Sequence, residues 1–219
     1  MEKYLKIFIS SMLAGFCIVI GATAYLLCSK ESFSMKVVGS LLFGIGLYTI
    51  IHFKLWLYTG KVGNTLDNKP KYLLDLVVCS LGNFFGVFVL ASLISLTRNG
   101  DVLKEISTSL VNTKQNDSWY SIFILSFMCG IMIYLAVKGH EKASYPLAKA
   151  LFAYLPISVF ILCGYEHVIA NSCYYTYAHF FNAKSLLYFI LMFLGNAAGA
   201  IAFDGLLKLI DHVNQKESQ

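Results

Sequence analysis

Residues Gly164–Asn171 read GYEHVIAN, and this stretch puts a carboxyl, an imidazole and an amide inside a long apolar region. The apolar run of residues 150–165 meets Glu166 and His167 and then continues to Ala183. A charged group at the centre of a membrane segment costs roughly 2.5–3.5 kcal/mol, so such groups are rare and mark functional sites. We interpret Glu166 and His167 as the functional centre of a membrane protein.

The composition of the whole chain favours a membrane environment. Of its 219 residues, 58% are hydrophobic and only 13% are charged, whereas a soluble domain has about a quarter charged residues. Four runs contain no Asp, Glu, Lys or Arg, namely residues 7–29, 76–97, 118–137 and 185–203. Each approaches the roughly 20 residues that a helix needs to cross a bilayer. With the interrupted runs 37–60 and 150–183, the sequence predicts six transmembrane helices, the second and fifth of them interrupted.

The first apolar run also has features of a signal peptide. Lys3 and Lys6 precede it, and Ala22–Ala24 resembles a cleavage site. The run continues past that site to Cys28, which is longer than a usual signal core. We therefore expect this run to be retained as the first membrane helix.

Matching features occur in the two halves of the chain. A G-N-x-x-G motif occupies residues 82–86 and again 195–199, and the two interruptions lie near Thr59 and His167. Gly60 and Gly63 argue against a continuous helix near Thr59. The two halves comprise residues of about 1–98 and 118–212, and each crosses the membrane three times. Because three is an odd number, the second half must be inverted relative to the first. We predict a single membrane domain over 1–219, all-α, with an inverted 3+3 repeat and a site near the bilayer midplane.

The G-N-x-x-G motifs have a simpler structural interpretation. Glycines four residues apart lie on one helix face and allow another backbone to approach closely. We interpret Asn83 and Asn196 as residues that hydrogen-bond across such a contact and not as substrate ligands. The polar stretch 99–117 is expected to be an outer connector.

Lysine and arginine positions predict the orientation. With the N-terminus inside, ten lysines fall in inner regions: Lys3, Lys6, Lys61, Lys69, Lys71, Lys138, Lys142, Lys149, Lys208 and Lys216. Six basic residues fall outside: Lys30, Lys36, Arg98, Lys104, Lys114 and Lys184. We expect a multi-pass protein of the cell (inner) membrane with both termini cytoplasmic.

Several strings resemble the formate/nitrite transporter family, in the same order along almost the whole chain. They are Leu13-Ala14-Gly15 with Ile20-Gly21, Leu57-Tyr58-Thr59, Lys149-Ala150-Leu151 with Leu155-Pro156, Glu166-His167 with Ile169-Ala170-Asn171, and both G-N-x-x-G motifs. The resemblance implies an aquaporin-like helical fold with one pore per subunit and assembly as a homopentamer in the lipid bilayer. It also implies passage of small monovalent anions such as formate, nitrite, hydrosulfide or short monocarboxylates.

The resemblance further implies roles for individual residues. His167 would be the central pore histidine, Thr59 its partner from the loop, and Lys149 the lysine that draws anions into a vestibule. Glu166 and Asn171 would support the histidine and the interrupted fifth helix.

Three residues align with the apolar constriction of the family: Leu57, Tyr58 and Phe160. The chain departs from the family pattern nearby, because Tyr58 replaces a phenylalanine and Trp56 replaces an acidic residue found in many members. These differences bear on which anion passes.

The resemblance and the residue chemistry together suggest a mechanism. An apolar constriction disfavours a charged solute and raises the pKa of a bound weak acid. Histidine has an unperturbed pKa of about 6.5, so His167 can hold or release a proton near neutrality. Transport is then passive or coupled to protons, and His167 either protonates the anion or supplies positive potential. The sequence leaves these alternatives open.

Two other classes of membrane protein are the alternatives. A neutral-solute, aquaporin-like channel would carry paired N-P-A motifs, but proline occurs only at 70, 146 and 156. A membrane-embedded enzyme using His167 and Glu166 would need a nucleophile or metal cluster, for which Cys163 and Cys173 are the only candidates. We therefore expect no enzyme activity, no cofactor, no metal and no nucleic-acid partner.

Overall fold

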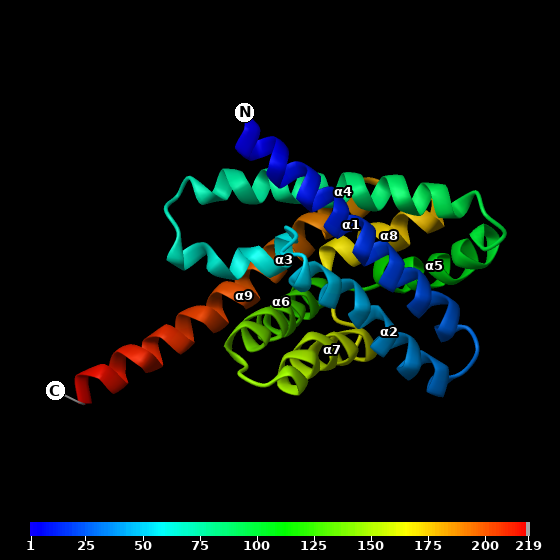
Figure 1. Cartoon of the computed structure of the whole chain (residues 1–219). Helices are drawn as coiled ribbons and strands as arrows, with labels where there is room; N and C mark the ends of the chain where they lie inside the picture. Colours follow the sequence, from blue (N-terminus) through cyan, green and yellow to red (C-terminus); the bar gives the residue numbers. More distant parts are fainter. Residues whose placement is uncertain (218–219) are drawn as a thin grey trace.

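The computed structural model describes residues 1–217, which form nine α-helices and one 3-10 helix (Figure 1). The elements are α1 (Glu2–Ser29), α2 (Phe33–His52), α3 (Tyr58–Lys61), the 3-10 helix η1 (Val62–Asp67), α4 (Tyr72–Ser95), α5 (Gly100–Gln115), α6 (Trp119–Lys142), α7 (Pro146–Leu162), α8 (Val168–Ala178) and α9 (Ala183–Glu217). Residues 218–219, part of the expected domain, lie outside the described residues.

Five of the described helices are long and apolar enough to cross a membrane, namely α1, α2, α4, α6 and α9. Each of the four charge-free runs lies almost wholly within one of these helices. The expected fifth segment is divided between α7, with 17 residues, and α8, with 11 residues. Neither part alone has the roughly 20 residues of a full crossing.

Helix α4 illustrates how these helices distribute their side chains. Large apolar residues three or four positions apart stay about half exposed along one face: Leu74, Val77, Leu81, Phe85 and Phe88. The opposite face is buried and consists partly of small and polar residues, including Ser80, Gly82, Asn83 and Gly86. A soluble protein buries its large apolar face, so this arrangement is typical of a helix that contacts lipid on one side and other helices on the other.

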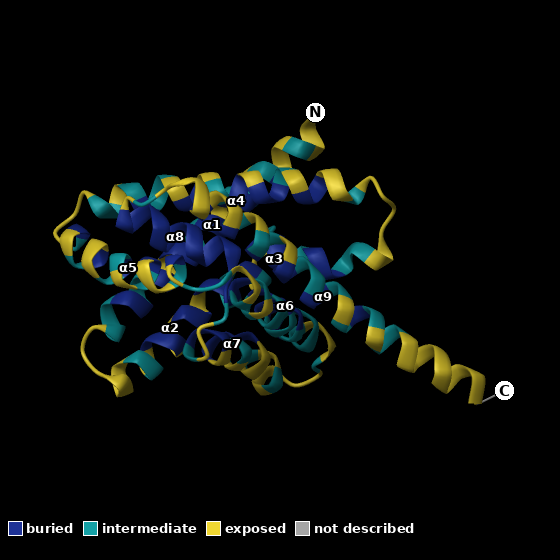
Figure 2. Ribbon diagram, turned by 180° about the vertical axis from the view of Figure 1, so that it is seen from behind, coloured by how far each residue is buried: buried dark blue, intermediate teal, exposed yellow. Residues whose placement is uncertain are grey.

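The helices pack in two similar groups. Helix α1 packs against α2 and α4, and α6 packs in the same way against α7 and α9. Contacts between α2 and α7 join the groups. Helix α8 lies in the middle against α1, α4 and α5, and all of its residues are buried, as the dark blue helix in Figure 2 shows. The last turns of α9, in contrast, are exposed.

Close packing depends on the glycines of the two G-N-x-x-G motifs. A Cβ on Gly86 would clash with the carbonyl oxygen of Met12 on α1. A Cβ on Gly199 would clash in the same way with the carbonyl oxygen of Phe127 on α6. Both obstacles are backbone atoms, so a side chain here would have to push whole helices apart.

The expectation of a connector at residues 99–117 was wrong, because most of this stretch is helix α5. Leu103, Ser107 and Val111 recur every four residues and are buried, whereas most of the remaining residues are polar. The helix packs this buried face against α8. Its exposed polar face dominated the composition and hid the helical periodicity.

Candidate functional site

Two segments of matching conformation interrupt the helices at the site. Residues 53–57 separate α2 from α3, and residues 163–167 separate α7 from α8, with the same succession of turn and irregular residues. The break expected near Thr59 therefore lies just before it, at residues 53–57. Gly60 belongs to α3 and Gly63 to η1, so the two glycines used to predict the break do not themselves end a helix.

Both interruptions begin with a residue in the left-handed conformation. Lys54 has a φ of 55° and Gly164 a φ of 69°. After each of them the chain closes a 2.9 Å backbone hydrogen bond back to the helix, from Leu55 to Ile50 and from Tyr165 to Phe160. This pattern is a Schellman helix end, which satisfies the last carbonyl groups of the helix and redirects the chain.

Asn196 of α9 holds the second interruption in place and is fully buried. Its Oδ1 accepts a 3.0 Å hydrogen bond from the Val168 N–H at the start of α8. Its Nδ2 donates to the carbonyl oxygens of Glu166 and Ser126, at 2.7 and 2.8 Å. One amide thus pairs two backbone groups of the interruption that would otherwise lack partners, and ties them to the Ser126 carbonyl of α6.

Asn83 of α4 does the same at the first interruption. Its Oδ1 accepts from the Tyr58 N–H, and its Nδ2 donates to the carbonyl oxygens of Trp56 and Ser11, each at 2.8 Å. The sequence interpretation of these asparagines as helix-packing residues was incomplete. The repeated G-N-x-x-G motif pointed to these asparagines. Their position beside the helix interruptions is visible only in the three-dimensional structure.

His167 and Thr59 meet at the junction of the two interruptions. The Nε2 atom of His167 lies 2.9 Å from Thr59 Oγ1, and both residues are buried. The Nδ1 atom accepts a 3.0 Å hydrogen bond from the Ala170 N–H and so caps α8. An accepting nitrogen has no hydrogen, which makes this imidazole neutral with its proton on Nε2.

Glu166 lies beside this histidine in a second polar cluster. Lys114 of α5 donates to both of its carboxylate oxygens, at 2.8 and 2.7 Å. Asn171 Nδ2 donates to the same carboxylate at 2.6 Å. The Glu166 side chain is 4% exposed and that of Lys114 is 13% exposed, so the pair is largely desolvated. Removing either partner from such a pair leaves an uncompensated buried charge.

A cavity lies on each side of the Thr59–His167 pair. The Leu57 cavity, about 320 Å³, is lined by Leu57, Gly60, Lys54, Lys61 and His140 among others. The Phe160 cavity is about 60 Å³ and is lined by residues of α1, α5, α7 and α8, including His167. Thr59 is not a lining residue of either cavity, but its neighbours Leu57 and Gly60 line the first. The Thr59–His167 hydrogen bond therefore joins the segment that borders the Leu57 cavity to a residue that lines the Phe160 cavity.

Two of the expected constriction residues line these cavities and one does not. Leu57 lines the first cavity, and Phe160, stacked on His167 at 5.7 Å between ring centroids, lines the second. Tyr58 lines neither, because its ring stacks on Phe193 of α9 and its hydroxyl donates to the Phe193 carbonyl.

The structure does not bring Lys149 to the site. It is exposed in the first turn of α7 and lines neither cavity, although its carbonyl oxygen pairs with His140 Nδ1. Lys114 takes part instead, and sequence reasoning missed it. Lys114 and Glu166 lie 52 positions apart in different elements, so no spacing pattern linked them.

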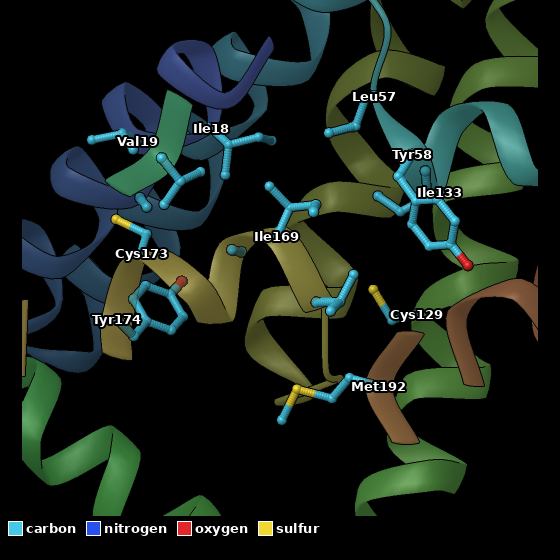
Figure 3. Packing of buried hydrophobic residues seen from close by; sticks show 14 of the residues in the cluster. Ile18, Val19, Leu57, Tyr58, Cys129, Ile133, Ile169, Cys173, Tyr174 and Met192 are labelled. Atoms are coloured by element: carbon cyan, nitrogen blue, oxygen red, sulfur yellow. The ribbon is translucent and has the colours of Figure 1, made fainter. Parts of the chain in front are cut away.

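Helix α8 supplies most of the packing around the junction. In Figure 3, Ile169 of α8 lies between the α1 side chains and Ile133 and Cys129 of α6, with Met192 of α9 nearby. Nearly all of these side chains are fully enclosed. The interrupted segments are therefore held by a packed apolar core and not by the hydrogen bonds alone.

Comparisons with known proteins agree with this architecture. The family model described as "Formate/nitrite transporter" matches residues 1–210. The formate channel FocA of Haemophilus influenzae is 26% identical over 181 residues, which is 75% of this chain and 63% of that protein. The chain thus spans somewhat less than two thirds of that relative. The uncharacterized transporter YrhG of Bacillus subtilis is 24% identical over 84% of this chain and 74% of its own length.

Solved structures share the fold. A pentameric formate channel with formate bound superposes with a TM-score of 0.82 at 21% identity, covering 97% of this chain and 98% of that chain. An ion channel of the FNT family superposes with a TM-score of 0.77 at 22% identity, covering 94% of this chain and 90% of the other.

Proposed function

Because this chain belongs to the formate/nitrite transporter family, we propose that it carries small monovalent anions across a membrane through a pore within each protomer. Formate, nitrite, hydrosulfide and short monocarboxylates are the candidate substrates. The observation that carries the proposal is the Thr59–His167 hydrogen bond between two cavities. The family and the matching proteins of known role are transporters and channels, so the chain belongs with transport proteins and not with enzymes.

The proposed architecture is a single membrane domain with six membrane segments in an inverted 3+3 repeat. Its second segment would comprise α2 with α3 and η1, and its fifth would comprise α7 with α8. Support comes from the pairs of equivalent contacts: Asn83 with Asn196, Lys54 with Gly164, and the glycine contacts of α4 and α9. Three crossings per half then give the two halves opposite orientations.

The proposed route passes from the Leu57 cavity, along Leu57 and Phe160, to the Phe160 cavity. These apolar side chains exclude water, so an anion that enters between them loses most of its hydration. The start of a helix carries partial positive charge, and α8 begins at this junction. That charge would favour an anion here, and the polar atoms of Thr59 and His167 would replace part of the lost hydration.

His167 is proposed to act as a neutral hydrogen-bond donor through Nε2. A cationic imidazole carries an N–H at both nitrogens, and Nδ1 faces the Ala170 N–H at 3.0 Å. His167 therefore becomes a proton carrier only when Nδ1 leaves that amide. This favours hydrogen bonding to the anion over a permanent positive charge in the resting site. Proton coupling then requires a transient opening of the α8 cap.

Lysines are proposed to attract anions to the Leu57 cavity. Lys54 and Lys61 line the Leu57 cavity, and neither has an acidic partner within the described chain. Lys61 instead lies 5.5 Å from the centroid of the Trp56 ring. Lys149, exposed on α7, would add a more distant charge. Lys114 contributes less net attraction, because Glu166 neutralises it.

A pentamer in the cell (inner) membrane with both termini cytoplasmic is the proposed assembly. The matching formate channel is pentameric, and the exposed apolar stripe of α4 provides a surface for lipid or a neighbouring protomer. Anions and protons are the proposed transported species.

A flux panel in liposomes tests the function directly. We expect purified protein to accelerate formate and nitrite uptake well above the rate of empty liposomes. Where uptake is coupled to protons, it should be faster at the lower of two pH values. Glycerol flux should remain at the background of empty liposomes. Glycerol flux without anion flux would identify a neutral-solute channel and contradict the proposal.

A further inference from the structure

Three tyrosines line the Phe160 cavity, and two of them, Tyr25 and Tyr174, are buried with hydroxyl groups that have no hydrogen-bond partner in the described chain. Tyr25 of α1 is 5% exposed and Tyr174 of α8 is 7% exposed, and neither hydroxyl has a hydrogen-bond partner among residues 1–217. The fully enclosed unpaired polar atoms of the described chain are Asp75 Oδ1 and Ser107 Oγ. Both phenol oxygens therefore border open space, and the space that they share is this cavity.

The other tyrosines of α8 behave differently. Tyr177 shares a 2.7 Å hydrogen bond with Thr23, and Tyr175 accepts one of the same length from Gln115. Their hydroxyls are satisfied inside the protein, as buried polar groups normally are. The unpaired hydroxyl of Tyr174, whose side chain is labelled in Figure 3, is thus an exception on its own helix.

Apart from the half-buried Tyr165, the other polar side chains of the cavity are already engaged. Lys114 and Asn171 bind the Glu166 carboxylate. His167 uses one nitrogen for Thr59 and the other for Ala170. A hydroxyl that borders a cavity and has no protein acceptor can donate to whatever solute enters. The two phenols are consequently the buried donors that a small solute can satisfy on arrival.

We propose that Tyr25 and Tyr174 form a two-donor site that selects solutes carrying oxygen acceptors, such as formate and nitrite, over hydrosulfide. The proposal rests on the proposed function and names the substrate class that this cavity prefers. A phenol adds no charge, so the site discriminates by hydrogen bonding, and sulfur is a weaker acceptor than a carboxylate oxygen. A cavity of about 60 Å³ suits a solute of a few heavy atoms.

The test compares Tyr25→Phe, Tyr174→Phe and the double variant with the wild type in liposomes. Formate, nitrite and hydrosulfide fluxes are measured at a pH at which all three solutes are ionised. We expect each single variant to lose roughly tenfold in formate and nitrite flux, as for one hydrogen bond to a charged group, with hydrosulfide flux within about twofold. Tyr177→Phe, the same change on the same helix outside the cavity, should keep the wild-type ratio of formate to hydrosulfide flux.

Two outcomes would overturn the proposal. An unchanged formate-to-hydrosulfide ratio in the double variant, or an equal loss of both fluxes, would mean that the phenols do not select. The single variants keep the test valid should the double variant fail to assemble. Absence of anion flux in the wild type would instead refute the proposed function itself, so the two failures are distinguishable.

Discussion

Replacing His167 with asparagine should lower proton-coupled formate flux by about a hundredfold while the protein stays folded. Asparagine is a good helix N-cap, so it can replace the Nδ1 cap on the Ala170 N–H. It does not titrate, and its shorter side chain does not reach Thr59. The substitution therefore removes the chemistry of the imidazole and keeps its structural role. Flux is measured in liposomes with and without an imposed proton gradient.

The matched control makes the same substitution at the other end of α8. His179 is exposed and left-handed, with a φ of 51°, a conformation that asparagine accepts readily. His179→Asn should retain wild-type flux. Unchanged, still proton-coupled uptake by His167→Asn would remove His167 from the mechanism.

Replacing Asn196 with leucine should lower the melting temperature by on the order of 10 °C. Leucine has a similar size but leaves the Val168 N–H and the Glu166 carbonyl oxygen unpaired and removes the added hydrogen bond to the Ser126 carbonyl. Unpaired buried groups cost about 1–3 kcal/mol each. The two groups together cost roughly 2–6 kcal/mol, which corresponds to a shift of this order at roughly 2–4 °C per kcal/mol for a chain of this size.

Thermal unfolding in detergent, followed by size-exclusion chromatography, provides the measurement. Asn112→Leu is the control, because Asn112 is exposed on α5 and its side chain has no hydrogen bond within residues 1–217. That variant should melt within about 2 °C of the wild type, as for an exposed surface position. Equal melting temperatures for both variants would show that the asparagine does not hold the interruption.

The sequence predicted the membrane helices well, because lipid imposes long charge-free runs that are easily read. It also singled out Glu166 and His167 as candidate site residues, because ionisable groups inside such runs are unusual. Helix α5 was not predicted from the sequence, because its apolar face consists of few residues within a polar stretch. The prediction of a connector rested on the polar composition of residues 99–117, whereas packing against α8 stabilises this stretch as a helix.

The positions of the chain breaks were harder to predict. Glycines near Thr59 suggested a break there, but the left-handed turn falls on Lys54, a residue type that rarely adopts this conformation. The roles of Asn83, Asn196 and Lys114 depend on contacts between distant segments. Such contacts leave no periodic pattern in the sequence. The sequence therefore showed the G-N-x-x-G motifs but not the groups that their asparagines contact.

The location of a bound anion in an experimentally determined structure tests the central claim most directly. We predict that a map of the purified protein in excess formate will show the anion inside each protomer, between the Leu57 and Phe160 cavities and within hydrogen-bond distance of His167 Nε2. Anion density only between protomers, with none beside His167, would contradict the account.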